Sequence, residues 1–207
     1  MASGKDTTAQ YAAYTLGISY LQIDNPSYAL TAFDQAGRLA FSSSIQEEAR
    51  FTHAKLQLDQ KRGAEAITEL NEFLKKYPDS PFENEANELV GEAYLASNNY
   101  PAAIAYIEKL KNRTPRINAT YQRLTFNQGV ADYNAERYPA ALVNFNKSLT
   151  VSGEPELRQT ATFWKAEALS AQKKWAEAIP FYIQVRVGEY GLKSLYGLGY
   201  AHYNQKD

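Results

Sequence analysis

The feature that most constrains this chain is a set of small residues that recur at nearly constant intervals. The intervals are 37, 37, 38, 37 and 33 residues, and the set is Gly17, Ala54, Gly91, Gly129, Ala166 and Gly199. Twelve residues after each of the first five comes an alanine, at Ala29, Ala66, Ala103, Ala141 and Ala178. Four residues further on comes a large apolar residue, at Phe33, Leu70, Ile107, Phe145 and Tyr182. Such regularity predicts stacked copies of one unit, each packed on its neighbours, in place of a single central core.

One copy, residues 80–115, predicts the structure of the unit. Ser80 and Glu83 have the spacing of a capping box, with Pro81 at the first helical position. Small and apolar residues then recur at helical spacing until residues 97–99, and a second apolar stripe begins near Pro101. The unit is therefore predicted to be helix, tight turn, helix. The whole chain is predicted to be all-α, with five such units and one extra helix.

The same register sets the expected boundaries. Residues 1–6 are expected to be a leader or tag, and residues 7–207 one array with repeats at about 7–43, 44–80, 81–117, 118–154, 155–190 and a half repeat at 191–207. Helix starts are expected at Thr7 with Gln10, at Ser44 with Glu47, at Asn118 and at Pro155. Pro180 lies about one turn into the second helix of the fifth unit, where a bend or a late start is expected.

This pattern resembles the tetratricopeptide repeat, in which a small residue of the first helix is followed by an aromatic residue and then by an alanine and an apolar residue in the second helix. Residues 16–20, Leu-Gly-Ile-Ser-Tyr, match it almost completely together with Ala29, Phe33 and Ala36. The resemblance covers roughly residues 7–207. It implies a right-handed α–α superhelix that acts as a protein-interaction scaffold. The aromatic residue is replaced in four copies, by Gln57, Asp132, Leu169 and His202.

The resemblance also implies where a partner would bind. In this family, positions 2, 5, 9 and 12 of the first helices line a concave groove. The implied partner-binding residues are Tyr14, Phe51, Glu85, Glu88, Glu92, Phe126, Tyr133, Phe163, Glu167, Tyr196 and Tyr200. Aromatic residues occupy five of the six places at position 5, and the three glutamates of the third copy would favour a basic segment of a peptide. The alternative is that these rings pack between neighbouring first helices.

Composition argues against several other functions. The absence of cysteine excludes disulfides, thiol catalysis and thiolate metal sites. His53 and His202 are the only histidines and lie about four repeats apart, too far to share a metal site or a catalytic triad. A net charge of -1 with scattered basic residues gives no support for nucleic acid as a partner, and no stretch approaches the roughly 20 apolar residues of a membrane span. We therefore expect no enzymatic activity, no cofactor and no metal, and a protein or peptide partner.

The last expected helix, residues 192–204, is apolar on most sides. Terminal repeats normally have a polar outer face, so we expect this chain to be a fragment of a longer protein, with possible self-association through residues 192–204. The junction at residues 77–81 and the repeat length resemble tetratricopeptide units of bacterial envelope proteins of the BamD and CpoB kind, which favours the periplasm or cell envelope over the cytoplasm. Two alternatives stay open: a self-assembling module, or the regulatory segment of an enzyme.

Overall fold

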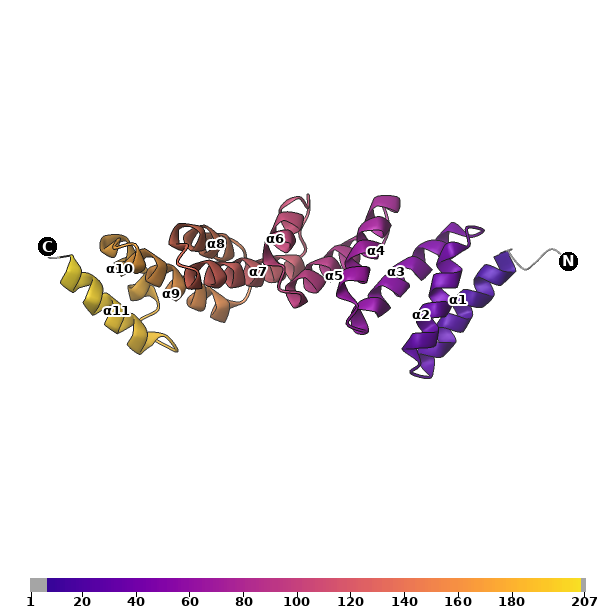
Figure 1. Cartoon of the computed structure of the whole chain (residues 1–207), viewed down its shortest axis with the longest axis horizontal. Helices are drawn as coiled ribbons and strands as arrows, with labels where there is room; N and C mark the ends of the chain where they lie inside the picture. The colour runs from indigo at the N-terminus through magenta and orange to yellow at the C-terminus, as the bar shows by residue number, and fades with distance from the viewer. Residues whose placement is uncertain (1–6, 206–207) are drawn as a thin grey trace. The chain divides into compact units, whose positions relative to one another are not determined.

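The computed structural model describes residues 7–205, which form eleven α-helices and no strand (Figure 1). The helices are α1 (Thr7–Gln22), α2 (Pro26–Arg38), α3 (Ser43–Asp59), α4 (Gly63–Lys76), α5 (Glu83–Ala96), α6 (Tyr100–Glu108), α7 (Pro115–Asn134), α8 (Tyr138–Thr150), α9 (Pro155–Ala171), α10 (Trp175–Gln184) and α11 (Gly191–Asn204). The predicted all-α architecture of five helical pairs and one extra helix is confirmed. The expected leader, residues 1–6, lies outside the described residues.

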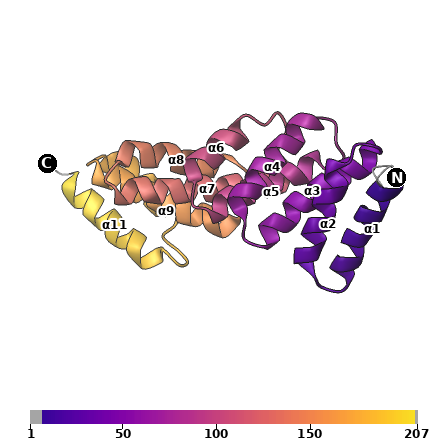
Figure 2. The ribbon, with the colours of Figure 1, turned by 45° about the vertical axis from the view of Figure 1, so that its right-hand side comes forward.

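The chain divides into two compact units, residues 1–98 and residues 99–207. The first contains α1–α5 and the second α6–α11, so the boundary falls in a turn of the third predicted repeat. Within the first unit α2 runs back along α1 and α4 along α3, and within the second α8 runs back along α7 and α10 along α9 (Figures 1 and 2). A single array over residues 7–207 stays a prediction.

The core of each unit is built on the predicted register. The five recurring alanines are completely buried, and the five large apolar residues that follow them are at most 1% exposed. The small residues let these large side chains approach the first helix. A Cβ atom added to Gly17 would lie 2.9 Å from the Phe33 ring, and one added to Gly129 would lie 2.6 Å from the Phe145 ring. Any larger residue at either place would have to push the ring aside.

Each turn between the two helices of a pair has the same backbone geometry. One non-glycine residue with positive φ stands seven places after the small residue, at Asp24, Lys61, Asn98, Glu136 and Lys173, with φ between 54° and 62°. In the first turn the backbone N–H of Asp24 donates to Leu21 (3.1 Å) and that of Asn25 donates to Tyr20 (2.8 Å). This left-handed residue ends the first helix and reverses the chain into the second.

Several predicted helix starts were wrong. Ser42, not Ser44 with Glu47, caps α3 by accepting a hydrogen bond from the Ile45 backbone. Thr114, not Asn118, caps α7 by accepting a hydrogen bond from the Ile117 backbone N–H. It directly precedes a proline, whose fixed φ angle suits the first position of a helix.

The third copy also starts differently from the prediction. The Ser80 hydroxyl accepts from the Phe82 backbone N–H (3.1 Å) within a turn, so α5 begins at Glu83 and the predicted capping box is absent. Pro180 lies inside α10, which already begins at Trp175, so the helix does not start late. The fifth repeat starts as predicted, at Pro155.

Two buried glutamines fix the entry into the next first helix. Gln10 does not cap α1: its side-chain oxygen accepts from the Ser42 backbone N–H (2.7 Å), and its amide nitrogen donates to the Leu39 carbonyl (2.7 Å). Gln122 repeats this arrangement in the second unit, where its oxygen accepts from the backbone N–H of Glu154 (2.6 Å). Ser42 and Glu154 directly precede α3 and α9. In each unit a buried amide therefore replaces water at a helix entry.

No helix among the described residues has the length and apolar character needed to cross a membrane.

Candidate functional site

The eleven residues implied as partner-binding are shared between the two units. The first unit holds Tyr14, Phe51, Glu85, Glu88 and Glu92. The second unit holds Phe126, Tyr133, Phe163, Glu167, Tyr196 and Tyr200.

In the first unit these residues make contacts within the fold. Phe51 is 4% exposed and stacks on Phe82, with ring centroids 4.6 Å apart. The Tyr14 hydroxyl donates to Glu48 (2.6 Å), which links α1 to α3, and burial together with this hydrogen bond raises the pKa of Tyr14 to about 12. Glu85 pairs with Lys55 of α3 (2.6 Å). The Phe51 ring is therefore enclosed within the fold and has no open face for a partner.

Phe163 in the second unit is also a core residue. It is 7% exposed, and its ring stacks on Tyr190 at 4.7 Å. Phe126 is half-buried and packs against the cluster around Phe145. The implied role of Phe163 in partner binding is therefore corrected, because its ring is enclosed within the fold.

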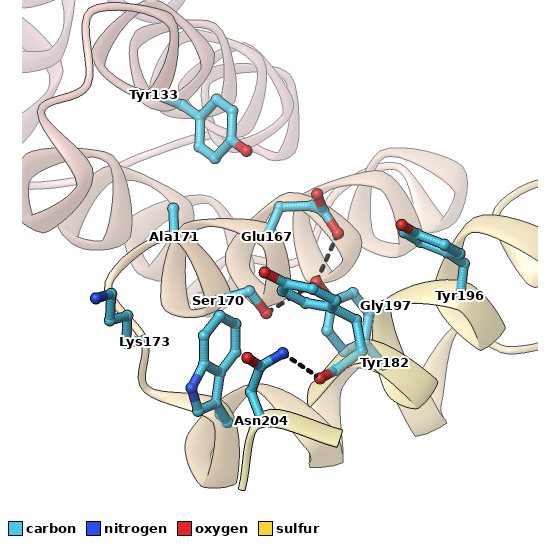
Figure 3. Close-up of a pocket in the computed structure, with 11 residues that line it drawn as sticks. Tyr133, Glu167, Ser170, Ala171, Lys173, Tyr182, Tyr196, Gly197 and Asn204 are labelled. Atoms are coloured by element: carbon cyan, nitrogen blue, oxygen red, sulfur yellow. Dashed lines mark hydrogen bonds between the residues drawn. The ribbon is translucent and has the colours of Figure 1, made fainter. Parts of the chain in front are cut away.

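The other four residues of the second unit come together around one pocket. Tyr133 of α7, Glu167 of α9, and Tyr196 and Tyr200 of α11 line a cavity of about 620 Å³ (Figure 3). The remaining lining residues are Ser170, Ala171, Lys173, Trp175, Tyr182, Gly197 and Asn204.

A glycine allows α11 to form one wall of this pocket. A Cβ atom at Gly197 would lie 2.5 Å from the Tyr182 ring, so only glycine permits this approach of α11 to α10.

A carboxylate held by hydrogen bonding lies inside the pocket. The Tyr182 hydroxyl donates to Glu167 Oε1 (2.6 Å) and also lies 3.0 Å from the Ser170 hydroxyl (Figure 3). Burial raises the pKa of Tyr182, as does the hydrogen bond to Glu167. Burial also raises the pKa of Tyr133, with the charge of Glu167 adding to the effect. Both phenols therefore stay neutral at physiological pH beside the Glu167 carboxylate.

The mouth of the pocket is aromatic. Tyr196 is 77% exposed and Tyr200 is 51% exposed, and the Tyr200 ring meets Trp175 edge to face at 5.4 Å. The Asn204 side-chain amide donates to the Tyr200 carbonyl (2.8 Å), which leaves its oxygen as an acceptor on the other side (Figure 3). Lys173, the only lysine or arginine among the lining residues, turns its amino group away from Glu167 (Figure 3). The pocket can thus offer rings and hydrogen-bond acceptors to a ligand.

Sequence reasoning missed the other seven lining residues, among them Trp175, Tyr182 and Asn204. A signal for Trp175 exists, because Tyr100, Tyr138 and Trp175 all stand three places before the recurring alanine. Tyr182 was expected in the core, and it is indeed buried, but its hydroxyl reaches the pocket. Nothing in the repeat pattern marks Asn204.

Comparison with known proteins supports the repeat assignment. The model of the tetratricopeptide repeat family matches residues 51–116. No curated protein matches the chain.

Solved structures share its fold at low identity. The C-terminal part of a TPR repeat-containing protein from Cytophaga hutchinsonii is 18% identical with a TM-score of 0.52, over 86% of this chain and 66% of that one. MamA of AMB-1 is 18% identical with a TM-score of 0.50, over 87% of this chain and 92% of that one. The chain thus spans just under two thirds of the Cytophaga structure. Residues 51–116 therefore match the tetratricopeptide repeat family, and the chain has the fold of a tetratricopeptide repeat structure.

Proposed function

We propose that this chain is a protein-interaction scaffold that binds a peptide or protein segment at the pocket lined by α7, α9, α10 and α11. The observation that carries the proposal is the exposure of Tyr196 and Tyr200 beside a cavity that contains a carboxylate. Rigid aromatic side chains at a concave site supply most of the binding energy in many interfaces, because they bury a large area at a low entropic cost.

The chemistry of the pocket favours binding over catalysis. A general base or nucleophile works best with a pKa near the working pH. Tyr133 and Tyr182 have raised pKa values and are therefore poor bases and poor nucleophiles near neutral pH. The lining residues include no histidine.

A peptide-display selection against the purified chain tests the proposal. Selected peptides should slow amide hydrogen exchange in α9 and α11. Replacing Tyr196 and Tyr200 together by alanine should weaken their binding by about 30-fold or more, as expected for the loss of about 2 kcal/mol from aromatic anchors. Tyr203→Ala is the matched control, because Tyr203 is 77% exposed on the same helix but does not line the pocket. Failure to select any peptide, or equal binding by the double variant, would contradict the proposal.

Self-association through α11 is a second candidate function. Leu192, Leu195, Tyr196, Tyr200 and Tyr203 are all at least half exposed and recur at helical spacing. Two copies could bury these stripes against each other. Sedimentation velocity should then show concentration-dependent dimers. Leu192→Glu should dissociate these dimers and leave the pocket intact, because Leu192 does not line the pocket. Monomers at all concentrations would remove this candidate.

We further propose that this chain belongs to a cell-envelope assembly or secretion protein. Its support is the junction at residues 77–81 together with the spacing of the small residues. Fractionation of the source cells should recover the protein with the envelope. Recovery in the cytosol would contradict this assignment.

A further inference from the structure

We propose that the pocket of the second unit receives the side chain of an arginine from the bound segment. This inference rests on the proposed function and names the chemistry of the same site. It is carried by the combination of aromatic rings from three helices with one carboxylate that has no basic partner in the pocket.

The rings provide faces that attract a cation. Tyr133, Tyr196, Tyr200 and Trp175 line the cavity from α7, α11 and α10, and Figure 3 shows Tyr133 and Tyr196 on two sides of Glu167. A cation within about 6 Å of such rings is attracted by their negative faces, and tryptophan and tyrosine attract it well. The attraction grows when the cation is removed from water, as it is inside a pocket.

The carboxylate provides the counter-charge. The Tyr182 hydroxyl holds one oxygen of Glu167 at 2.6 Å, and in Figure 3 the other oxygen points away from Tyr182. Among the described residues no ion pair with Glu167 is found, and Lys173, the one basic residue that lines the pocket, turns its amino group away from Glu167 (Figure 3). A ligand that covered this site with apolar atoms or with a negative charge would desolvate the carboxylate without compensation. A positively charged ligand avoids that cost.

The further acceptors favour a guanidinium group over an ammonium group. The Asn204 oxygen lies opposite the amide nitrogen that donates to Tyr200, and Ser170 contributes a hydroxyl. Arginine has five N–H donors in a planar group that can stack on a ring while it bonds a carboxylate, whereas lysine presents a compact, strongly hydrated charge. A cavity of about 620 Å³ has room for the guanidinium and part of the segment that carries it.

The probe for the test is N-acetyl-arginine amide, followed by the indole N–H resonance of Trp175 in proton–nitrogen correlation spectra. The expected result is a saturable shift with a dissociation constant in the millimolar range. N-acetyl-citrulline amide has nearly the same shape without the charge and should bind at least tenfold more weakly. N-acetyl-lysine amide should fall between the two. Citrulline binding as tightly as arginine, or lysine binding more tightly, would overturn the proposal.

Substitutions locate the probe. Glu167→Gln keeps the shape of the side chain and should weaken arginine binding at least tenfold, whereas Glu177→Gln, at an exposed position of α10, should change nothing. Tyr200→Leu should weaken binding several-fold with the carboxylate still present, which keeps the test valid if Glu167→Gln disturbs the fold. Equal binding by Glu167→Gln and the parent chain would overturn the proposal.

The two proposals fail in different ways. Selected peptides that lack arginine, protect α9 and α11, and bind Glu167→Gln unchanged would overturn the arginine pocket and leave the scaffold function intact. An arginine probe that binds through Glu167 while no peptide can be selected would overturn the scaffold function and leave the cation specificity of the pocket.

Discussion

At the scale of single residues, each of the five turns places a residue other than glycine in the left-handed backbone conformation, which lowers the stability of the fold. A residue other than glycine in the left-handed region is destabilised by about 1–2 kcal/mol, and four of the five positions hold aspartate, lysine or glutamate. Asp24 and Asn98 are of residue types that tolerate this conformation comparatively well. Side chains other than glycine therefore stand where glycine would fit the backbone best.

Glu136→Gly should consequently stabilise the chain. Glycine adopts the left-handed conformation without steric strain, and this relief exceeds the extra backbone entropy that glycine loses on folding. The free energy of unfolding should therefore rise by about 0.5–1 kcal/mol. Denaturant titration measures it. Ala135→Gly is the control, because Ala135 precedes this residue without positive φ and should gain nothing. A loss of stability in Glu136→Gly would show that the glutamate side chain contributes more than its strain.

At the scale of helices, the spacing of small and large residues could be read from the sequence because it reflects close packing. Gly17 must be small where the Phe33 ring crosses α1, and the same pair recurs as Gly129 with Phe145. Helix starts were harder to place, since Ser42 and Ser44 are both good caps and local spacing cannot choose between them.

The site was only partly predictable for a similar reason. Phe51, Phe163 and Tyr196 share one repeat position, yet two of them are buried and one is exposed. Phe51 and Phe163 are covered by Phe82 and Tyr190, which stand just before the next first helix and lie outside the repeat pattern. Burial at this position thus depends on a connecting residue that the pattern does not specify.

The buried alanines give the sharpest test of the helical register. Ala103→Leu should reduce the free energy of unfolding by about 1–3 kcal/mol, because the added carbons have no space in a packed core. Ala105→Leu is the matched control, two places along α6 at an exposed position, and should change little. Equal shifts in melting temperature for the two variants would mean that the register is misassigned.

At the scale of the whole molecule, the two units should respond separately to local damage, because stability in repeat proteins is a sum of unit and neighbour terms. Gln10→Ala leaves the backbone N–H of Ser42 without its partner and should cost about 1–3 kcal/mol. Amide hydrogen exchange should accelerate more in α1–α3 than in α9–α11. Gln22→Ala, at an exposed position, is the control. Uniform acceleration along the chain would indicate one cooperative body.

The placement of the two tryptophans means that tryptophan fluorescence reports on one unit and not on the other. Trp164 and Trp175 are the only ones in the chain, and both belong to the second unit. Indole emission therefore monitors that unit alone, while far-ultraviolet circular dichroism reports on the helices of both. Melting curves recorded with the two signals would coincide for a single transition and separate if the first unit melts on its own.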